Sequence, residues 1–542
     1  MMTRIQNNPV MILIPVCLAI FFAHLDVLYV NIMEARNFVT AREMVTDGNW
    51  VLTTMNGLPR YEKPPLPTWL TALSGMLFGM ENLFALRLPA ALAATFMVWM
   101  LYRLSAHISQ SKKPGLTAAL ILATSFYIIF SGRNGQWDIF THSFMLAGIW
   151  FLFLFLEYRH NIWRNALLAA AFTGFSFLSK GPVSLYALLL PFLLAYGVVY
   201  RFGDMRKKIA PLVVFLLLAT ATGLSWYVYV RLADPVSFLA VTQEETANWG
   251  SYNLRPFYYY WSFFTQSGIW TLPAFTGLLY PYLKNRVIHK KAYRFSLLWT
   301  LFSVVLLSVI PEKKSRYLLP VLVPLAINTA FYIEYLIREF KYLKHKKETL
   351  PVYFNFGLIA AIGVVFPVAG YFFFGARLQG LWLYFVLVSA ALTAIGILIF
   401  IQLKQKNIHY VFLLTVTFVM SITALGFPVA KAFNTNPEFR DVGALRTYIE
   451  KNALKLYAFS EIAPEMVWRY GETVPPVRKK NTVTIPHEAT FGILVVPNEV
   501  DAFYCTFEKD FTIAPKAVFN MNYHKNNKNR LIGMFYIVKK RS

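Results

Sequence analysis

Residues 380–402 read GLWLYFVLVSAALTAIGILIFIQ, a stretch that contains no charged side chain. An α-helix that crosses the hydrocarbon core of a bilayer needs about 20 consecutive apolar residues, because each residue advances the helix by only about 1.5 Å. This stretch meets that length and predicts a helix that spans a membrane. The fold class then depends on how often the same pattern recurs.

Similar apolar stretches follow one another along most of the chain. Of its 542 residues, 57% are hydrophobic and 15% are charged, a balance that soluble domains do not have. The sequence therefore predicts a polytopic α-helical membrane protein with about 13 spans. The other candidate spans lie near residues 10–30, 84–106, 115–131, 138–157, 166–180, 182–200, 210–230, 260–282, 295–310, 317–337, 352–374 and 408–432.

Basic residues in the loops predict the orientation. If the N-terminus is cytoplasmic, every inward loop is basic, as the positive-inside rule requires. Arg4 precedes the first span and no small-residue cleavage pattern follows, which predicts a retained signal anchor. An odd number of spans then places the C-terminal residues outside. The inward loops hold Lys112 and Lys113, Arg159 and Arg164, and the basic residues of 206–208, 284–294, 338–347 and 404–406.

The net charge of +25 is explained by this topology, so nucleic-acid binding is not expected. The outward loops nevertheless carry cations that the rule does not predict. An anion at the membrane boundary would balance them, and a lipid phosphate is the natural candidate. These cations are Arg36, Arg42, Arg60, Lys63, Arg133, Lys180, Arg255, Lys313, Lys314 and Arg316.

The chain divides into a membrane domain and a soluble domain. Residues 1–432 form the membrane domain, with large outer loops at 31–83 and 232–259. Residues 433–542 have the composition of a soluble α/β domain, which we expect outside the cytoplasm. Cys17 and the tail residue Cys505 are too far apart in this plan to predict a disulfide or a thiolate metal site. Strand-like stretches lie at 454–459, 491–496 and 531–538, and a helical pattern lies near 440–452.

The first outer loop begins with a helical pattern. Phe38, Ala41 and Val45 recur on one face. Asn31 and Glu34 have the spacing of a capping box, in which the glutamate bonds back to the residue before the helix. We expect this helix to lie along the membrane surface.

Later in the same loop is the run Glu62-Lys63-Pro64-Pro65-Leu66-Pro67. Prolines restrict the backbone to a stiff, extended path. A carboxylate and an ammonium are therefore held where lipid begins, which suggests a built binding site rather than a tether.

A series of short motifs runs in order through roughly the first 330 residues. They are Glu34-Ala35-Arg36, Ala41-Arg42-Glu43-Met44, Gly48-Asn49-Trp50, Asn56-Gly57, Tyr61-Glu62-Lys63-Pro64-Pro65, residues 133–138, Ser179-Lys180-Gly181-Pro182, and residues 256–260 and 314–320. Together they resemble the membrane glycosyltransferases with the GT-C fold that use polyprenyl-phosphate sugars. The likeness is greatest to the lipid A aminoarabinose transferases, which are related to the protein O-mannosyltransferases.

This resemblance implies an inverting-type glycosyltransferase of the bacterial inner membrane. Such an enzyme moves a sugar from undecaprenyl phosphate to lipid A or a related envelope glycolipid at the outer face. Breaking the anomeric C–O bond leaves a phosphate anion, which cations stabilise, and a carboxylate can orient or deprotonate the acceptor.

The resemblance also implies roles for individual residues. Glu34 and Asp138 are the expected catalytic carboxylates. Each has a structural alternative, because Glu34 can cap its helix and Asp138 can favour a helix start or pair with a neighbouring arginine. The expected ligands of the donor phosphate or sugar are Lys63, Lys180, Arg255, Tyr317, Arg133, Arg36 and Glu62, several of which could instead anchor the chain at the interface.

One position departs from the family pattern. An Asp-Glu pair usually opens the first outer loop, but Met33 stands at the Asp position and Glu34 remains alone. A hydroxyl acceptor must lose a proton, whereas an acceptor phosphate is already ionised, so the departure favours a phosphate acceptor such as lipid A. No cofactor is certain. The divalent metal of some relatives is unsupported, because residues 232–259 contain no histidine to join Glu62.

Two other functions remain open. The same donor could serve a protein O-glycosyltransferase acting on Ser or Thr, or a transferase that modifies a glycan. From another class, the chain could be a non-catalytic binder or transporter of polyprenyl-phosphate lipids. Transporters usually show inverted repeats and broken helices at the midplane, and we find neither in this sequence.

Overall fold

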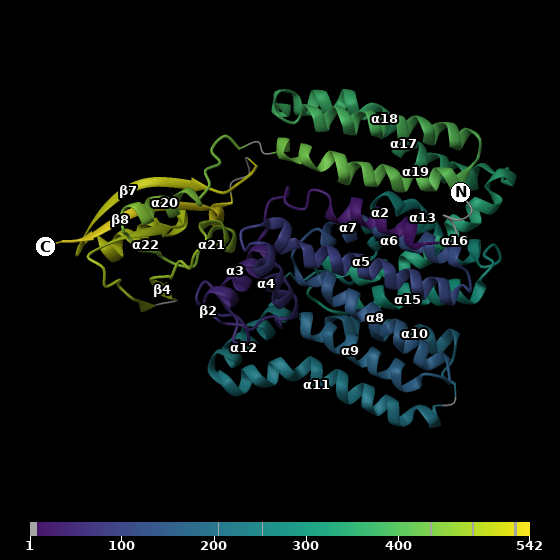
Figure 1. The fold of residues 1–542 in the computed structure, drawn as a ribbon, viewed down its shortest axis with the longest axis horizontal. Coiled ribbons are helices and arrows are strands. Elements are labelled where there is room, and N and C mark those ends of the chain that lie inside the picture. Colours follow the sequence, from purple (N-terminus) through teal and green to yellow (C-terminus); the bar gives the residue numbers. More distant parts are fainter. Residues whose placement is uncertain are drawn as a thin grey trace. The chain divides into compact units, whose positions relative to one another are not determined.

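The computed structural model describes residues 8–203, 205–251, 253–433, 436–479, 482–524 and 528–541 (Figure 1). The chain forms two compact units. The first comprises Met1–Asp26, Tyr61–Leu70 and Leu83–Val429, and the second comprises Val27–Arg60, Thr71–Asn82 and Ala430–Ser542.

The first unit is built from helices. Eight helical segments in the described part of the chain are long and apolar enough to cross a membrane, or nine if the bent pair α6 and α7 is one span. The protein is thus a polytopic helical membrane protein. Its helices are α2 (Val10–Cys17), α5 (Leu83–Ile108), α6 (Lys112–Ala123), α7 (Phe126–Gly132), α8 (Trp137–Glu157), α9 (Ile162–Lys180), α10 (Leu190–Val199), α11 (Ile209–Ala233), α12 (Pro235–Ser251), α13 (Thr271–Leu278), α14 (Tyr280–Leu283), α15 (Lys290–Val309), α16 (Leu322–Glu339), α17 (Lys346–Phe374), α18 (Trp382–Lys404) and α19 (Ile408–Ser421).

Shorter turns interrupt or extend these helices. Three are π-helical, a wide turn that often marks irregular points in a span. They are η1 (Leu18–Phe22), η2 (Leu185–Leu189) and η9 (Ile422–Gly426). The 3-10 turns are η3 (Arg206–Lys208), η4 (Phe257–Tyr260), η5 (Phe263–Trp270), η6 (Ser315–Val321), η7 (Phe340–Tyr342), η8 (Gly375–Leu378) and η10 (Phe427–Phe433).

Most predicted spans coincide with helices, but the one at 10–30 is helical only over residues 10–22, and two others are interrupted. The stretch at 260–282 is not one helix, because Gly268 adopts a φ of +67° and the backbone continues as the short helices α13 and α14. The stretch at 115–131 bends by 68° between α6 and α7. The total of 13 spans therefore stays a prediction.

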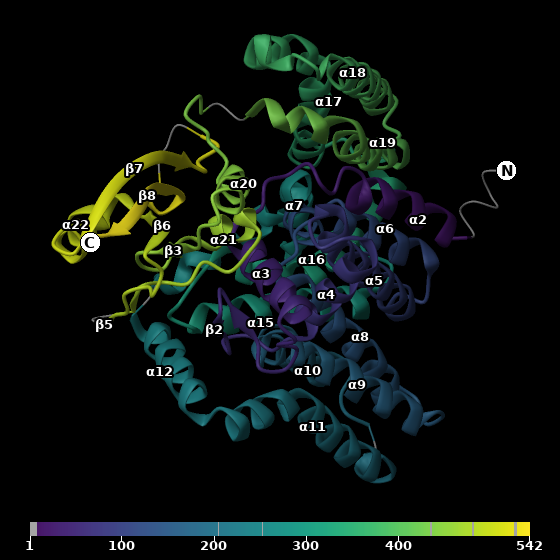
Figure 2. The same ribbon diagram turned by 60° about the vertical axis from the view of Figure 1, so that its left-hand side comes forward.

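Burial distinguishes central helices from peripheral ones in this unit. Of the apolar window that contains α16, 89% is buried inside the protein, against 28% for that of α17. Helices α17, α18 and α19 lie side by side (Figures 1 and 2). Because apolar side chains on α17 remain exposed, this group is suited to face lipid.

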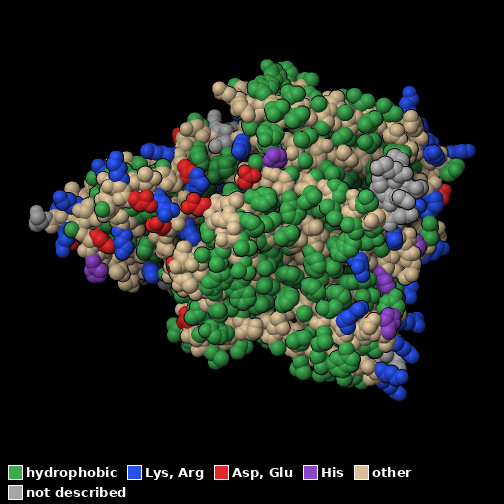
Figure 3. Space-filling view, in the orientation of Figure 1, with side chains coloured by type: hydrophobic (Ala, Val, Ile, Leu, Met, Phe, Trp, Pro, Cys, Tyr) green, Lys and Arg blue, Asp and Glu red, His purple; other side chains and the backbone are tan. Residues whose placement is uncertain are grey.

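Charged side chains are unevenly distributed over the helical unit. Figure 3 shows Lys and Arg side chains gathered along its right-hand edge, while hydrophobic side chains cover much of the middle of the visible face. This is the distribution expected of a membrane protein whose basic loops lie on one side. Which side faces the cytoplasm stays a prediction.

The second unit contains a four-stranded sheet with the order β3-β6-β8-β7. Strand β3 (Leu456–Ala458) is parallel to β6 (Thr490–Val495), while β8 (Ile532–Lys540) is antiparallel to both β6 and β7 (Phe511–Asn520). The three predicted strands are confirmed, and β7 was missed. The other elements are α3 (Ile32–Thr46), β1 (Thr54–Met55), β2 (Leu58–Pro59), α20 (Ala444–Lys451), α21 (Pro464–Tyr470), β4 (Arg478–Lys479), β5 (Thr482–Val483), η11 (Pro497–Glu499), α22 (Val500–Phe507) and η12 (Asn529–Leu531), and α4 (Leu66–Phe78) begins in the first unit and ends in this one.

Helices cover both faces of this sheet. Side chains alternate along a strand, so Phe491 and Ile493 of β6 pack into the cluster that contains Phe503 and Phe507 of α22. Leu494 faces the other way, into the cluster formed with α20 and α21. Figure 2 shows α22 beside β7 and β8. The arrangement is that of a small α/β domain.

Helix α3 is integrated into this second unit. The predicted helix and its capping box are confirmed, while its position relative to the membrane surface stays a prediction. The Phe38 ring lies 5.3 Å from that of Trp468, and Val39 belongs to the core below the sheet. The Arg42 guanidinium donates to the carbonyl of Val467 at 3.4 Å. Apolar contacts with C-terminal residues therefore bury this side of the helix.

The β1–β2 hairpin is held by a buried glutamate. Glu43 accepts hydrogen bonds from the Thr54 hydroxyl at 2.5 Å and from the backbone N–H groups of Asn56 at 2.6 Å and Gly57 at 3.3 Å. Asn56 and Gly57 both have positive φ, as a tight hairpin turn requires. Burial raises the pKa of the Glu43 carboxyl, and these donors oppose that rise.

Candidate active site

Asp138 and Lys180 form a buried ion pair within the first unit. Asp138 is in the first turn of α8, and Lys180 is the last residue of α9. The Lys180 ammonium donates to Oδ1 of Asp138, and the two residues are only 8% and 2% exposed, respectively. A carboxylate at a helix start and a cation at a helix end also suit the helix dipoles. The two predicted site residues are therefore in direct contact.

Tyr317 and its neighbours lie beside this pair. The Lys180 ammonium is 5.4 Å from the centre of the Tyr317 ring. The Tyr317 hydroxyl donates to Glu312 at 3.3 Å, and Glu312 also pairs with Lys314. The charge of Arg316 acts on both Asp138 and Lys180. The segment around η6 thus brings aromatic and cationic groups to the ion pair.

Lys63 approaches the same site from the proline run. Its ammonium lies 3.4 Å from a carboxylate oxygen of Glu245 on α12, and its charge also acts on Lys180. Pro64 and Pro65 behind it are buried, which fixes the path of the chain. The Lys63 side chain remains 26% exposed, so it can reach a ligand. Glu62, beside it, is half-buried.

Tyr61 ties this run to the junction of α11 and α12. Its hydroxyl donates to Asp234 at 3.0 Å, and its ring lies 6.2 Å from that of Trp226. Burial, and then the bond to Asp234, raises the pKa of Tyr61 to about 12. Hydrogen bonds from Ser237 and Tyr61 keep the pKa of Asp234 below its usual range. The phenol therefore stays protonated at neutral pH and acts as a donor.

Arg133 donates hydrogen bonds to backbone carbonyls and makes no contact with the Asp138–Lys180 pair among the contacts described. Its guanidinium donates to the carbonyls of Ile20, Ala23 and His24, at 2.7, 2.6 and 2.9 Å. It also lies 4.1 Å from the centre of the Phe427 ring. These carbonyls lie within the π-helical turn η1 and directly after it, where the helical hydrogen bonds end. A substrate role for Arg133 stays a prediction.

Arg255 lies in a loop paired with the segment before η6. Its backbone N–H donates to Pro311 at 3.2 Å, and its carbonyl accepts from the Lys313 ammonium at 3.1 Å. The guanidinium itself is exposed, 6.0 Å from the Tyr259 ring centre. The side chain is therefore available, but the structure does not bring it into contact with Asp138 or Lys180.

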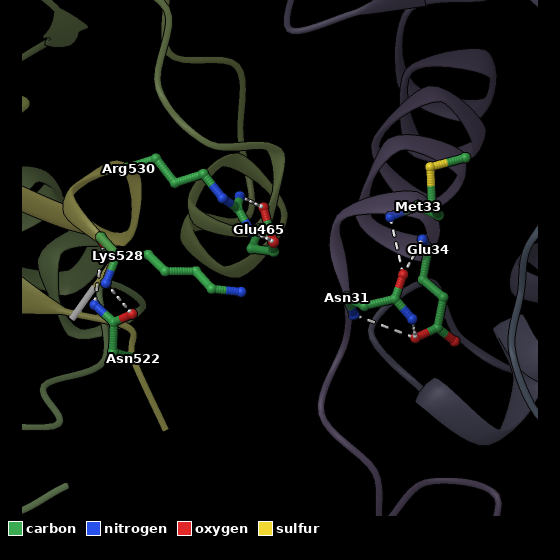
Figure 4. A network of polar contacts seen from close by, with 7 residues as sticks. All are labelled: Asn31, Met33, Glu34, Glu465, Asn522, Lys528 and Arg530. Carbon is green, nitrogen blue, oxygen red and sulfur yellow. Dashed lines mark hydrogen bonds and ion pairs between the residues drawn. The ribbon is translucent and has the colours of Figure 1, made fainter. Parts of the chain in front are cut away.

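Glu34 and Arg36 belong to the second unit. The Glu34 carboxylate accepts from the Asn31 side chain at 3.1 Å and from its backbone N–H at 3.3 Å. Figure 4 shows this carboxylate folded back onto Asn31, while the Met33 side chain points away from it. The same view contains the Arg530–Glu465 pair of the C-terminal domain, at 2.8 Å. Glu34 thus does cap α3, and Arg36, next but one, is half-buried.

Four polar residues of the site were not predicted from the sequence. His142 lies one helical turn after Asp138 and is 1% exposed, and their spacing of four residues is the one signal that could have identified it. Tyr127 interacts electrostatically with the Asp138 carboxylate. Glu245 and Glu312 are carboxylates that pair with cations of the site, and nothing in their local sequence indicates this.

The residues described here do not form a set suited to a divalent metal. No group of three or more His, Cys, Asp or Glu side chains is placed to hold one in the described part of the chain. The carboxylates near the site are instead paired with Lys63, Lys180 or Lys314.

The fold is that of a solved membrane glycosyltransferase. The structure matches ArnT from Cupriavidus metallidurans bound to undecaprenyl phosphate with a TM-score of 0.68, covering 97% of both chains at 15% identity. The apo state of the same protein gives a TM-score of 0.66 over 97% of this chain and 96% of that one, also at 15% identity. At this identity the likeness establishes the fold alone, and it confirms the GT-C fold predicted from the motifs.

The sequence comparisons indicate the same group of proteins. A family described as dolichyl-phosphate-mannose-protein mannosyltransferase matches residues 62–226. An undecaprenyl phosphate-alpha-4-amino-4-deoxy-L-arabinose arabinosyl transferase of Pseudomonas fluorescens is 28% identical over 310 residues, 54% of this chain and 52% of that protein. One from Proteus mirabilis is 24% identical over 341 residues, 61% of this chain and 60% of that protein.

These matches extend over only part of each relative. The chain spans little more than half the length of the curated proteins that it matches. It resembles the GT-C fold glycosyltransferases that use polyprenyl-phosphate sugars.

Proposed function

We propose that this chain is a glycosyltransferase that moves a sugar from undecaprenyl phosphate to lipid A or a related envelope glycolipid. The observation that carries the proposal is the buried Asp138–Lys180 pair with Lys63 and Tyr317 beside it. Lys180 is paired there with Asp138, Lys63 with Glu245, and the Tyr317 hydroxyl with Glu312. Such a group suits a substrate that has both a phosphate and a sugar.

In the proposed reaction the acceptor oxygen attacks the anomeric carbon as the bond to the donor phosphate breaks. The bonding electrons leave with the phosphate oxygen, and the new bond forms on the opposite face, which inverts the configuration. Lys63 and Lys180 balance the charge that develops on the leaving phosphate, and the Tyr317 hydroxyl can donate to it. Burial strengthens the effect of Lys180, because the local dielectric around it is low.

Asp138 is assigned to orient the sugar or the acceptor. Its Oδ1 is engaged by Lys180, and its Oδ2 has no hydrogen-bond partner among the described residues. A buried carboxylate oxygen without a partner is costly unless something completes its bonding. A hydroxyl of the bound sugar, or a donor group of the acceptor, would do so.

The absence of a carboxylate at position 33, where Met33 stands, is compatible with a phosphate as the acceptor. A phosphate is already ionised and reacts without a base, whereas a hydroxyl needs one. Glu34 is kept as a second proposed carboxylate, with Arg36, Arg255, Arg133 and Glu62 as further proposed substrate contacts. A thioether at position 33 cannot accept a proton, which supports lipid A over a Ser or Thr acceptor.

The proposed setting is the bacterial inner membrane, crossed about 13 times. In this arrangement the N-terminus is cytoplasmic, residues 1–432 form the membrane catalytic domain, and residues 433–542 form a periplasmic α/β domain. The basic loops support this orientation. Donor lipid and acceptor would then meet at the outer face.

The test uses purified chain with undecaprenyl-phosphate-linked aminoarabinose and lipid A. Mass spectrometry should show lipid A gaining one sugar-sized increment, and Asp138→Asn should abolish it. Transfer of the sugar to a protein or to another glycan in place of lipid A would show that this other molecule is the acceptor. Binding of donor without transfer to any acceptor would instead support the non-catalytic binder.

A further inference from the structure

A groove of about 620 Å³ lies at the other end of α8 from Asp138. It is formed where α5 and α8 end and where α6 begins, and all three belong to the first unit. A helix as long as α8 extends about 30 Å, so the groove is remote from the candidate active site. Nothing in the proposed reaction uses it.

Two cations in this groove are not neutralised by the protein. Arg103 is exposed, with its guanidinium carbon 5.6 Å from the centre of the Trp150 ring. Lys112, at the start of α6, is also exposed. Neither makes an ion pair with a carboxylate in the part of the chain that the structure describes. The Trp150 ring thus holds a guanidinium whose hydrogen-bond donors remain available.

The carboxylate at the end of α8 is already engaged. Glu157 ends α8 and lies 2.6 Å from Nε2 of His107, another residue of the groove. The Tyr158 hydroxyl is 3.4 Å from the same nitrogen. His107 and Glu157 therefore satisfy each other, and the groove keeps an excess of positive charge.

The walls of the groove are aromatic and apolar. Tyr102, Trp150, Leu154 and Tyr158 line it. Tyrosine and tryptophan are enriched where a membrane meets water, since one end of each side chain is apolar and the other polar. Because α5 and α8 are both candidate spans and the groove lies at their ends, we expect it at the level where lipid headgroups begin.

We propose that this groove binds the headgroup of one anionic phospholipid. The phosphate is held by the Arg103 fork and the Lys112 ammonium, and the glycerol and upper acyl chain pack on Tyr102, Leu154 and Trp150. A soluble phosphate offers the same anion but leaves the apolar walls uncovered. The lipid satisfies both parts of the groove.

The test counts lipids that stay bound to the intact purified protein in native mass spectrometry, with phosphatidylglycerol or phosphatidylcholine added. The wild type should retain one phosphatidylglycerol that Arg103→Gln/Lys112→Gln loses. Each cation near an anionic headgroup contributes about fivefold, so the affinity of the double variant should fall about 30-fold. Phosphatidylcholine should bind both proteins equally.

Lys346→Gln/Lys347→Gln is the matched control. Like the groove variant it removes two exposed cations from a basic region, but these two lysines lie outside the groove. It should retain phosphatidylglycerol as the wild type does. Equal retention by the groove variant and the control would overturn the proposal.

A third arm separates the two sources of phosphate. Excess inorganic phosphate should leave the retained phosphatidylglycerol in place. If it displaces that lipid completely, the groove is a site for a soluble anion and the lipid proposal is wrong. Should the double variant melt early, Lys112→Gln alone, with an expected fivefold loss, serves in its place.

Discussion

The Asp138 carboxylate and the Lys180 ammonium neutralise each other inside the protein, at the start of one helix and the end of the next. Their side chains are only 3% and 6% exposed. A buried charge is tolerated only when it is paired, because the desolvation of an ion is costly. The pair therefore has a structural role as well as its proposed chemical one, and the two must be separated by experiment.

A double-mutant cycle separates these roles. Asp138→Asn or Lys180→Met alone should lower the free energy of unfolding by about 3–5 kcal/mol, because each leaves an unpaired buried charge. The double variant should recover most of that stability in a thermal melt. Sugar transfer should be lost in all three. A stable double variant with normal turnover would show that the pair is structural only.

Substitutions at Lys63 and at Glu245 should have similar, small effects on stability but different effects on activity and donor binding. Their ion pair is partly exposed, so either Lys63→Ala or Glu245→Gln should change the free energy of unfolding by less than about 1 kcal/mol. Lys63→Ala should lower kcat/KM about 100-fold, the usual loss when one group that stabilises a developing anion is removed.

Glu245→Gln is the matched comparison. It removes a carboxylate that competes with the donor phosphate for Lys63, so binding of undecaprenyl phosphate should become tighter or stay unchanged. Weaker binding by Glu245→Gln would contradict a phosphate-binding role for Lys63.

Glu34 can be tested without disturbing its cap. Glutamine also completes a capping box, so Glu34→Gln should melt close to the wild type, whereas Glu34→Ala should be less stable by about 1 kcal/mol. If Glu34 acts as a carboxylate in the reaction, transfer should fall with Gln at an unchanged Tm. Normal turnover of the Gln variant would leave capping as its whole role.

Glu43 is predicted to be structural. Glu43→Ala leaves a hydroxyl and two backbone N–H groups without their acceptor, and a hydrogen bond to a charged group contributes about 1.5–3 kcal/mol. We expect at least about 2 kcal/mol of destabilisation and faster proteolysis near residues 54–59. Glu508→Ala, at an exposed position, should change neither measurement.

The Tyr61–Asp234 contact should weaken in alkali. The pKa of Tyr61 is raised to about 12 in the folded protein, against about 10 when unfolded. Its stabilising contribution is therefore present in full below pH 10 and declines as the pH rises from about 10 to about 12. Proteolysis at the α11–α12 junction should accelerate over that range in the wild type. Tyr61→Phe should be cleaved faster at neutral pH and should lack this alkaline step.

The membrane fold was predictable because its causes are local. A stretch such as residues 380–402 has no charged side chain, and lipid cannot satisfy an exposed backbone, so only a helix is stable there. The capping box at Asn31 and Glu34 depends on residues three apart and was equally readable. Strand β7 was missed because Pro515 and Lys516 interrupt its apolar alternation.

Tertiary structure decided which charges meet. Asp138, Lys180 and Tyr317 are far apart in sequence, and only the packing of α8, α9 and η6 places them together. Tertiary packing also places the Arg133 guanidinium against backbone carbonyls and pairs Lys63 with Glu245. Hydropathy and capping act within one or two helical turns and can be read from the sequence, whereas an ion pair depends on the path of the whole chain between its partners.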